Sequence, residues 1–99
     1  MFKGRTVDLW LEDAALPNGN TVQLEIIHHP GAAAIVAVDD AGRVALVRQY
    51  RHAAGGWILE LPAGKLDAGE PPLACAAREL REETGLVADD LHELGWIFT

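Results

Sequence analysis

The hydrophobic period changes near the end of the chain, and this change limits the folds that the sequence can adopt. From Pro71 onward, apolar side chains recur at intervals of three and four residues, which predicts an amphipathic helix. Proline suits the first turn of a helix, and glycine commonly ends one in a left-handed conformation. We therefore expect a helix from Pro71 to Thr84 that ends at Gly85. Its predicted core face consists of Leu73, Ala76, Ala77, Leu80 and Thr84.

The segments before this helix follow a different pattern, with apolar residues alternating or in short continuous runs, as in strands. A Pro17-Asn18-Gly19 turn separates the first two, which are expected to form an antiparallel pair. The next two flank a polar turn and predict a buried hairpin. Strands on both sides of a single helix predict one α/β domain with a mixed sheet. The expected strands are residues 7–11, 22–27, 32–38, 44–47, 57–61 and, after the helix, 91–98.

Composition excludes several classes of protein. With 99 residues the chain suits one domain with a modest core, and its formal net charge of −7 argues against binding nucleic acid through a broad basic surface. No apolar run is long enough to span a bilayer, and residues 1–11 contain no signal-peptide segment. The lone Cys75 cannot form an internal disulfide. We expect a cytoplasmic protein with no nucleic-acid or membrane partner.

Three glutamates share one side of the predicted helix. At about 100° per residue, Glu79, Glu82 and Glu83 fall at about 240°, 180° and 280° from Leu73, away from the expected core face. Carboxylates so spaced are neighbours and repel one another. One interpretation is a solvated acidic face, which helix spacing alone favours. The other is a site for hard divalent cations, which prefer oxygen ligands and would offset the repulsion.

The loop before the helix favours the second interpretation. Residues 63–70 join a strand to the helix, and their glycines allow a tight backbone that can turn a carbonyl towards the glutamates. Loop and helix together match the complete Nudix box, G-x5-E-x7-R-E-U-x-E-E-x-G-U, where U is aliphatic. The chain therefore resembles the Nudix hydrolases. The matching residues are Gly64, Glu70, Arg78, Glu79, Leu80, Glu82, Glu83, Gly85 and Leu86.

Four further segments resemble the ADP-ribose pyrophosphatase group of that family: residues 16–19, 29–32, 47–51 and 60–64. The whole chain is similar to the N-terminal part of such an enzyme. The resemblance implies an α/β/α sandwich with a mixed sheet, preceded by an N-terminal antiparallel strand pair and apparently truncated at the C-terminus. It also implies an N-terminal pair, residues 1–29, that forms a homodimer, and a Nudix domain, residues 30–99.

The implied reaction is the Mg²⁺-dependent hydrolysis of the pyrophosphate bond of a nucleoside diphosphate sugar, with ADP-ribose giving AMP and ribose 5-phosphate. By resemblance, Glu79, Glu83 and the backbone carbonyl of Ala63 would bind Mg²⁺ or Mn²⁺, and Glu82 would share a second ion. The three glutamates are thus the predicted catalytic residues. Such ions neutralise the charge that builds on the pyrophosphate and lower the pKa of the attacking water.

The same resemblance assigns supporting roles around the metal ligands. Arg78 and Glu70 are expected to pair and hold the loop against the helix, with Gly64 and Gly85 shaping the backbone on either side. This structural role is preferred to a catalytic one for both residues of the pair.

Three further residues are expected to contact substrate. Arg51 would grip a phosphate, Glu60 would add a water-mediated contact, and Glu25 would reach across the dimer to the adenine. For Glu25 the polar face of an alternating strand is the simpler interpretation.

The resemblance leaves the substrate open. The Nudix box specifies pyrophosphate chemistry and is nearly silent on base and sugar, so GDP-mannose is the alternative substrate. In the family a mobile loop that usually supplies the general base follows the position of Thr99. A catalytically weak, nucleotide-binding Nudix module is therefore the competing hypothesis.

Overall fold

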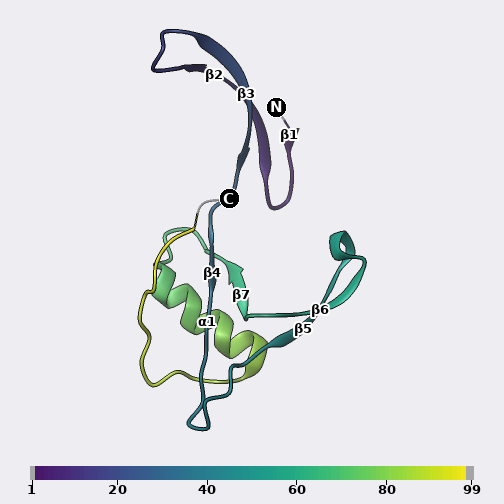
Figure 1. Ribbon diagram of the computed structural model, residues 1–99, viewed down its shortest axis with the longest axis vertical. Coiled ribbons are helices and arrows are strands. Elements are labelled where there is room, and N and C mark those ends of the chain that lie inside the picture. Colours follow the sequence, from purple (N-terminus) through teal and green to yellow (C-terminus); the bar gives the residue numbers. More distant parts are fainter. Residues whose placement is uncertain (1, 98–99) are drawn as a thin grey trace. The chain divides into compact units, whose positions relative to one another are not determined.

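The computed structural model describes residues 2–97 (Figure 1). The chain divides into two compact units, one ending at Pro30 and the other beginning at Gly31. No helix in the described range has both the length and the apolar character needed to cross a membrane. The predicted α/β class, with an N-terminal antiparallel strand set and one helix near the C-terminus, is confirmed.

The N-terminal unit is a three-stranded antiparallel sheet in the order β1-β2-β3. Its strands are β1 (Phe2–Lys3), β2 (Asp8–Ala15) and β3 (Thr21–His28). The turn between β2 and β3 places Gly19 at a φ of 87°, in the left-handed region that glycine tolerates, and Asn20 N donates to Asn18 Oδ1 at 3.0 Å. The expected N-terminal strand pair is therefore present, with a short third strand added at its edge.

The C-terminal unit contains two antiparallel strand pairs and the helix. Strand β4 (Ala32–Ala34) pairs with β7 (Ala63–Lys65), and β5 (Val47–Arg51) pairs with β6 (Gly56–Glu60) through the 3-10 turn η1 (His52–Ala54). Helix α1 (Pro72–Thr84) packs against β4 and β7. Among residues 2–97 the strand pairs are antiparallel and α1 is the one α-helix. The expected parallel pairing of a mixed sheet and the second helical layer of the sandwich are not found within that range.

Helix α1 ends where the sequence predicts, but it is rolled about its axis. Gly85 has a φ of 76° and its N–H donates to the Arg81 carbonyl at 2.9 Å, which closes the last turn. The buried positions are Cys75, Ala76 and Leu80. Two expected core positions are wrong, because Leu73 is 42% exposed and Ala77 is also exposed. The helix turns the side that carries Cys75 and Glu79, rather than its Leu73 side, towards β7 and the loop that follows.

The core of the C-terminal unit is small. It consists of Ile35, Ala76 and Leu80, with Ala33, Ala37 and Ala88 packed around it. The hairpin expected after residue 32 forms through a Val38–Val44 bridge and an Asp39 side chain that accepts from the backbone N–H groups of residues 41 and 43. It is not buried, since both bridge valines are exposed.

The strand expected at 91–98 is absent from residues 91–97, and Phe98 lies outside the described residues. The segment after α1 runs as an irregular chain, drawn in yellow in Figure 1. An apolar run becomes a strand only where a second strand satisfies its backbone hydrogen bonds. None of the described strands pairs with this segment.

Candidate functional site

Strand β7 and helix α1 meet at Gly64 and Glu79. A Cβ atom on Gly64 would overlap the carboxylate group of Glu79. The φ of Gly64 is not positive, so glycine is required here for close approach and not for an unusual backbone angle. The Glu79 side chain is only 13% exposed. The expectation that all three glutamates lie away from the packed face is therefore wrong for Glu79, because the helix is rolled towards the loop.

Arg78 holds the loop between β7 and α1 against the helix. Its Nε and Nη2 atoms donate to the two oxygens of Glu70, each at 2.8 Å, and Nη2 also donates to the Lys65 carbonyl at 3.2 Å. Glu70 closes the loop by accepting from the Asp67 N–H at 3.1 Å. The bond from Arg78 lowers the pKa of Glu70 to about 2, and the same bond raises the pKa of Arg78. The Arg78–Glu70 pair expected from the sequence is thus present.

The same guanidinium also contacts two of the three predicted metal ligands. Arg78 Nη1 donates to Glu79 Oε1 at 2.7 Å and to Glu82 Oε2 at 3.2 Å. Glu83 is exposed, and within residues 2–97 its side chain makes no hydrogen bond or ion pair. In that range no three histidine, cysteine or acidic side chains converge as a metal cluster. Two of the acids instead gather around Arg78.

The donor set nevertheless suits a hard divalent cation. Carboxylate and backbone carbonyl oxygens are the ligands that such ions prefer. Gly64 leaves room for the Glu79 carboxylate against the loop backbone, immediately after Ala63, whose carbonyl is the other expected ligand. Glu82 and Glu83 follow on the same helix with exposed side chains. The residues present therefore fit a divalent ion in their chemistry.

Arg51 and Glu60 form a second ion pair, across the β5–β6 hairpin. Arg51 Nε and Nη2 donate to the two oxygens of Glu60, each at 2.7 Å. This bond raises the pKa of Arg51 and lowers that of Glu60, and the charge of Glu83 raises the pKa of Arg51 further. The structure thus brings two of the expected substrate-binding residues into direct contact, and Glu83 is close enough to add to the field at Arg51.

Glu25 belongs to the other compact unit. It lies on β3, paired with Leu11 on β2, and is exposed. The three glutamates of α1 belong to the unit that begins at Gly31, and the contact of Glu25 with a base stays a prediction.

Cys75 and Asp67 contact the site and carry no role in the sequence analysis. The Cys75 thiol is fully buried and donates to the carbonyls of Gly64 at 3.6 Å and Lys65 at 3.7 Å. Burial raises its pKa, which keeps it protonated as a donor. Asp67 lies 3.6 Å from Arg78 Nη2. The signal for Cys75 was its spacing, three residues before Arg78 on one helix side.

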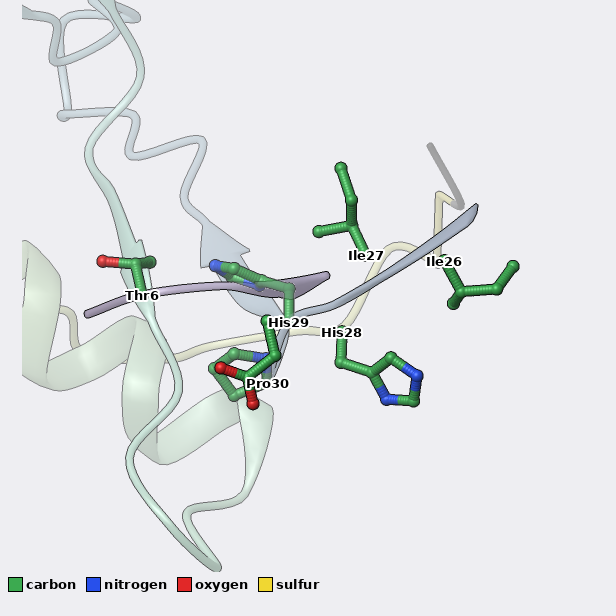
Figure 2. A pocket seen from close by; sticks show the side chains of 7 residues that line it. Thr6, Ile26, Ile27, His28, His29 and Pro30 are labelled. Carbon is green, nitrogen blue, oxygen red and sulfur yellow. The ribbon is translucent and has the colours of Figure 1, made fainter. Parts of the chain in front are cut away.

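A separate hollow lies in the N-terminal unit, at the end of the β2–β3 pair (Figure 2). Its volume is about 440 Å³, and its lining includes Thr6, Asp8, His28 and Pro30. His28 is engaged within the same sheet, because its Nε2 lies 2.9 Å from Glu12 Oε1 and its ring centroid lies 5.4 Å from that of Trp10. These contacts hold the His28 side chain within the N-terminal sheet.

Comparison with known proteins extends the similarity over the whole chain. Residues 28–99 match the NUDIX domain family model. The chain is 46% identical over 99 residues, all of its length and 54% of the relative, to an ADP-ribose pyrophosphatase of Bacillus subtilis (strain 168). It is 55% identical over 89 residues, 89% of its length and 43% of the relative, to an ADP-ribose pyrophosphatase of Mycobacterium tuberculosis (strain ATCC 25618 / H37Rv).

A third relative carries a different name. The chain is 45% identical over 94 residues, 95% of its length and 51% of the relative, to a methanol dehydrogenase activator of Bacillus methanolicus. The chain spans about half the length of these curated relatives.

Proposed function

The chain belongs to the NUDIX domain family, and from this membership we propose that it takes part in hydrolysing the pyrophosphate bond of a nucleoside diphosphate sugar. We propose ADP-ribose as the substrate, with AMP and ribose 5-phosphate as products, because two relatives at 46% and 55% identity are named ADP-ribose pyrophosphatases. The observation that carries the proposal is the close packing of Gly64 on Glu79 beside the Arg78–Glu70 pair.

Nudix hydrolases generally use divalent metal ions. We propose Mg²⁺ or Mn²⁺ here, held by Glu79, Glu82, Glu83 and the carbonyl of Ala63. When bound, such an ion supplies positive charge to the pyrophosphate and lowers the pKa of a water ligand. The support is chemical, since oxygen donors from helix α1 and the adjacent strand β7 suit a hard cation.

The protein's own side chains position these groups. Gly64 admits the Glu79 carboxylate, and the Arg78–Glu70 pair fixes the loop that follows β7, the strand that carries Ala63 and Gly64. Arg51 donates hydrogen bonds from Nε and Nη2 to Glu60. These bonds orient the guanidinium and leave Nη1 to bind a substrate phosphate. Glu60 therefore contributes to phosphate binding indirectly, by orienting Arg51.

The test of this function is turnover of a panel of nucleotides in the presence of Mg²⁺, with products separated by chromatography. We expect ADP-ribose to be cleaved to AMP and ribose 5-phosphate faster than GDP-mannose is cleaved. Faster cleavage of GDP-mannose would overturn the choice of substrate. Binding of ADP-ribose with no cleavage would overturn hydrolysis and favour a nucleotide-binding module.

We also propose that the N-terminal sheet forms a homodimer. Phe2, Leu9 and Ile27 are exposed and are neighbours across the strands, since Leu9 is opposite Phe2 on β1 and Ile27 on β3. Contiguous exposed apolar groups favour association. Changing Ile27 to Glu should shift the protein towards monomer in light scattering, whereas Gln49→Glu, which adds the same charge on β5 outside the N-terminal sheet, should not. An unchanged mass for Ile27→Glu would refute the interface.

Two finer proposals rest on this dimer and on composition. Glu25 lies two residues before Ile27 and so on the same face of β3, which is why we propose that it meets the adenine across the interface. A cytoplasmic location is supported by Cys75, a lone buried thiol that suits a reducing compartment.

A further inference from the structure

The two edges of the Arg78 guanidinium have different partners. The Nε and Nη2 edge is bound by both oxygens of Glu70 at 2.8 Å, and Nη2 also reaches the Lys65 carbonyl. The remaining nitrogen, Nη1, donates to Glu79 and Glu82. Arginine carries five N–H donors in a fixed plane. Glu70 can therefore keep the group in place whatever Nη1 contacts.

The position of Nη1 relieves a repulsion within the helix. Glu79 and Glu82 are three residues apart, a spacing at which like charges are neighbours and destabilise a helix. A positive nitrogen that is hydrogen-bonded to both carboxylates offsets this repulsion. A hard cation held by the same carboxylates would offset it as well. A carboxylate lone pair that faces Nη1 is not available to a cation, so the two positive groups compete.

Resting on the function proposed above, we infer that Arg78 Nη1 is the resident counterion of Glu79 and Glu82 in the metal-free protein and that it releases Glu82 when a divalent cation binds. The geometry indicates that Glu82 is released before Glu79. The contact to Glu82 is longer, 3.2 Å against 2.7 Å, and the Glu82 side chain is 53% exposed against 13% for Glu79.

Glu79 can contact the Arg78 guanidinium and a cation at the same time. Its Oε1 accepts a hydrogen bond from Arg78 Nη1, whereas within residues 2–97 the guanidinium makes no hydrogen bond to Oε2, which can therefore turn towards a cation. Arg78 is thus a positioning residue with two opposing effects. It stabilises the metal-free helix, and its nearby charge weakens the attraction of the same acids for a cation.

The first test measures stability and metal affinity in the Arg78→Gln variant. We expect a lower melting temperature in EDTA than the parent has. We also expect Mn²⁺ to bind about two- to fivefold more tightly by calorimetry, the factor that corresponds to an exposed ion pair. Mn²⁺ binding weakened tenfold or more would mean that the acids need Arg78 to bind metal, and would overturn the inference.

Arg81→Gln is the matched control. It removes the same charge one turn further along α1, and among residues 2–97 its side chain makes no hydrogen bond or ion pair. We expect the control to change the Mn²⁺ dissociation constant by less than about twofold, as for a screened surface charge. If Mn²⁺ bound more tightly to both variants by the same factor, the cause would be a general effect of charge, and the proposed release of Glu82 by Arg78 Nη1 would be overturned.

The second test uses the unaltered protein, so it does not depend on whether a variant folds. During a Mg²⁺ titration followed by NMR, the Arg78 Nε–H signal should stay protected because Glu70 retains it, while the side-chain carboxyl signal of Glu82 shifts more than that of Glu79. Loss of protection at Nε–H, or a larger shift at Glu79, would refute the order of release. Neither readout requires catalysis, so failure to hydrolyse ADP-ribose would affect only the proposed function.

Discussion

Gly64→Ala should separate stability from function at the point where β7 meets α1. The added methyl group would overlap the carboxylate of Glu79, and the backbone of Gly64 needs no glycine-specific angle. The obstructing atoms are the end of a flexible side chain, so the fold can accommodate the methyl group by turning Glu79 out of its place. That movement removes Glu79 from both Gly64 on β7 and Arg78.

The magnitude follows from this geometry. Overfilling a packed site typically costs about 1–3 kcal/mol, and a flexible side chain places this case at the lower end. Replacing glycine also stabilises by about 0.4–1 kcal/mol through the unfolded chain. We therefore expect a net loss of at most about 0.6 kcal/mol, which for a domain of this size lowers the melting temperature by less than about 5 °C. Loss of metal binding and hydrolysis should be much larger, at least about a hundredfold in rate.

Gly85→Ala is the matched control for this prediction. Gly85 has a φ of 76°, and an added Cβ would meet no atom within 4 Å, so its substitution strains the backbone without touching the acids. Gly85→Ala should therefore lose at least as much stability as Gly64→Ala. The two variants should still differ in their response to Mn²⁺, measured by melting in EDTA and in excess Mn²⁺ and by turnover of ADP-ribose. The reasoning fails if Gly64→Ala binds Mn²⁺ as the parent does, or if Gly85→Ala loses Mn²⁺ binding to the same extent.

Three further predictions concern charge. Glu83→Gln should leave the metal-free melting temperature nearly unchanged and lower the rate of hydrolysis by about a hundredfold or more. Glu93→Gln, which lies outside the Nudix box, should alter neither quantity. Equal hydrolysis rates for the two variants would contradict this prediction. The pKa of Glu70 is held at about 2 against an ordinary 4.5, so the stabilisation from its pairing with Arg78 is complete above pH 4.5 and is lost as the pH falls towards 2. Glu70→Gln should therefore make the melting temperature less dependent on pH between 4.5 and 2. A dependence equal to that of the parent would refute the linkage. Excess Mg²⁺ at about a hundredfold over its dissociation constant should stabilise the protein by about 2.7 kcal/mol, reversed by EDTA; a melting temperature indifferent to divalent ions would indicate a merely solvated acidic face.

Part of the site could be foreseen because its determinants are local. The Arg78–Glu70 pair is eight residues apart in sequence and was expected from the resemblance to the Nudix box. The contact between Arg51 and Glu60 was not foreseen as a pair, although both residues were candidates. The register of β5 and β6 places Val47 opposite Glu60 and Arg51 opposite Gly56, so Arg51 and Glu60 lie at opposite ends of the strand pair and meet only because their side chains reach along it. Register is set by the turn and by packing, and residue type alone leaves it undetermined.

Sequence alone determined the type and limits of the elements that carry the site. Proline before the helix and Gly85 after it act within one turn, so the end of α1 at Thr84 and its start within one residue of Pro71 follow from local chemistry. The relative angles of Glu79, Glu82 and Glu83 follow likewise from the helical repeat.

Only the tertiary structure decided which way the helix faces. The repeat fixes angles between side chains but not the direction of the partner surface, and both the Leu73 side and the Cys75 side offer small or apolar groups. Packing of α1 on β4 and β7 buries Cys75 and leaves Leu73 42% exposed. That roll places Glu79 against Gly64, and it lets a guanidinium anchored by a loop residue reach the acids. Contacts of this kind depend on where the loop backbone lies in space, which no spacing along one helix can specify.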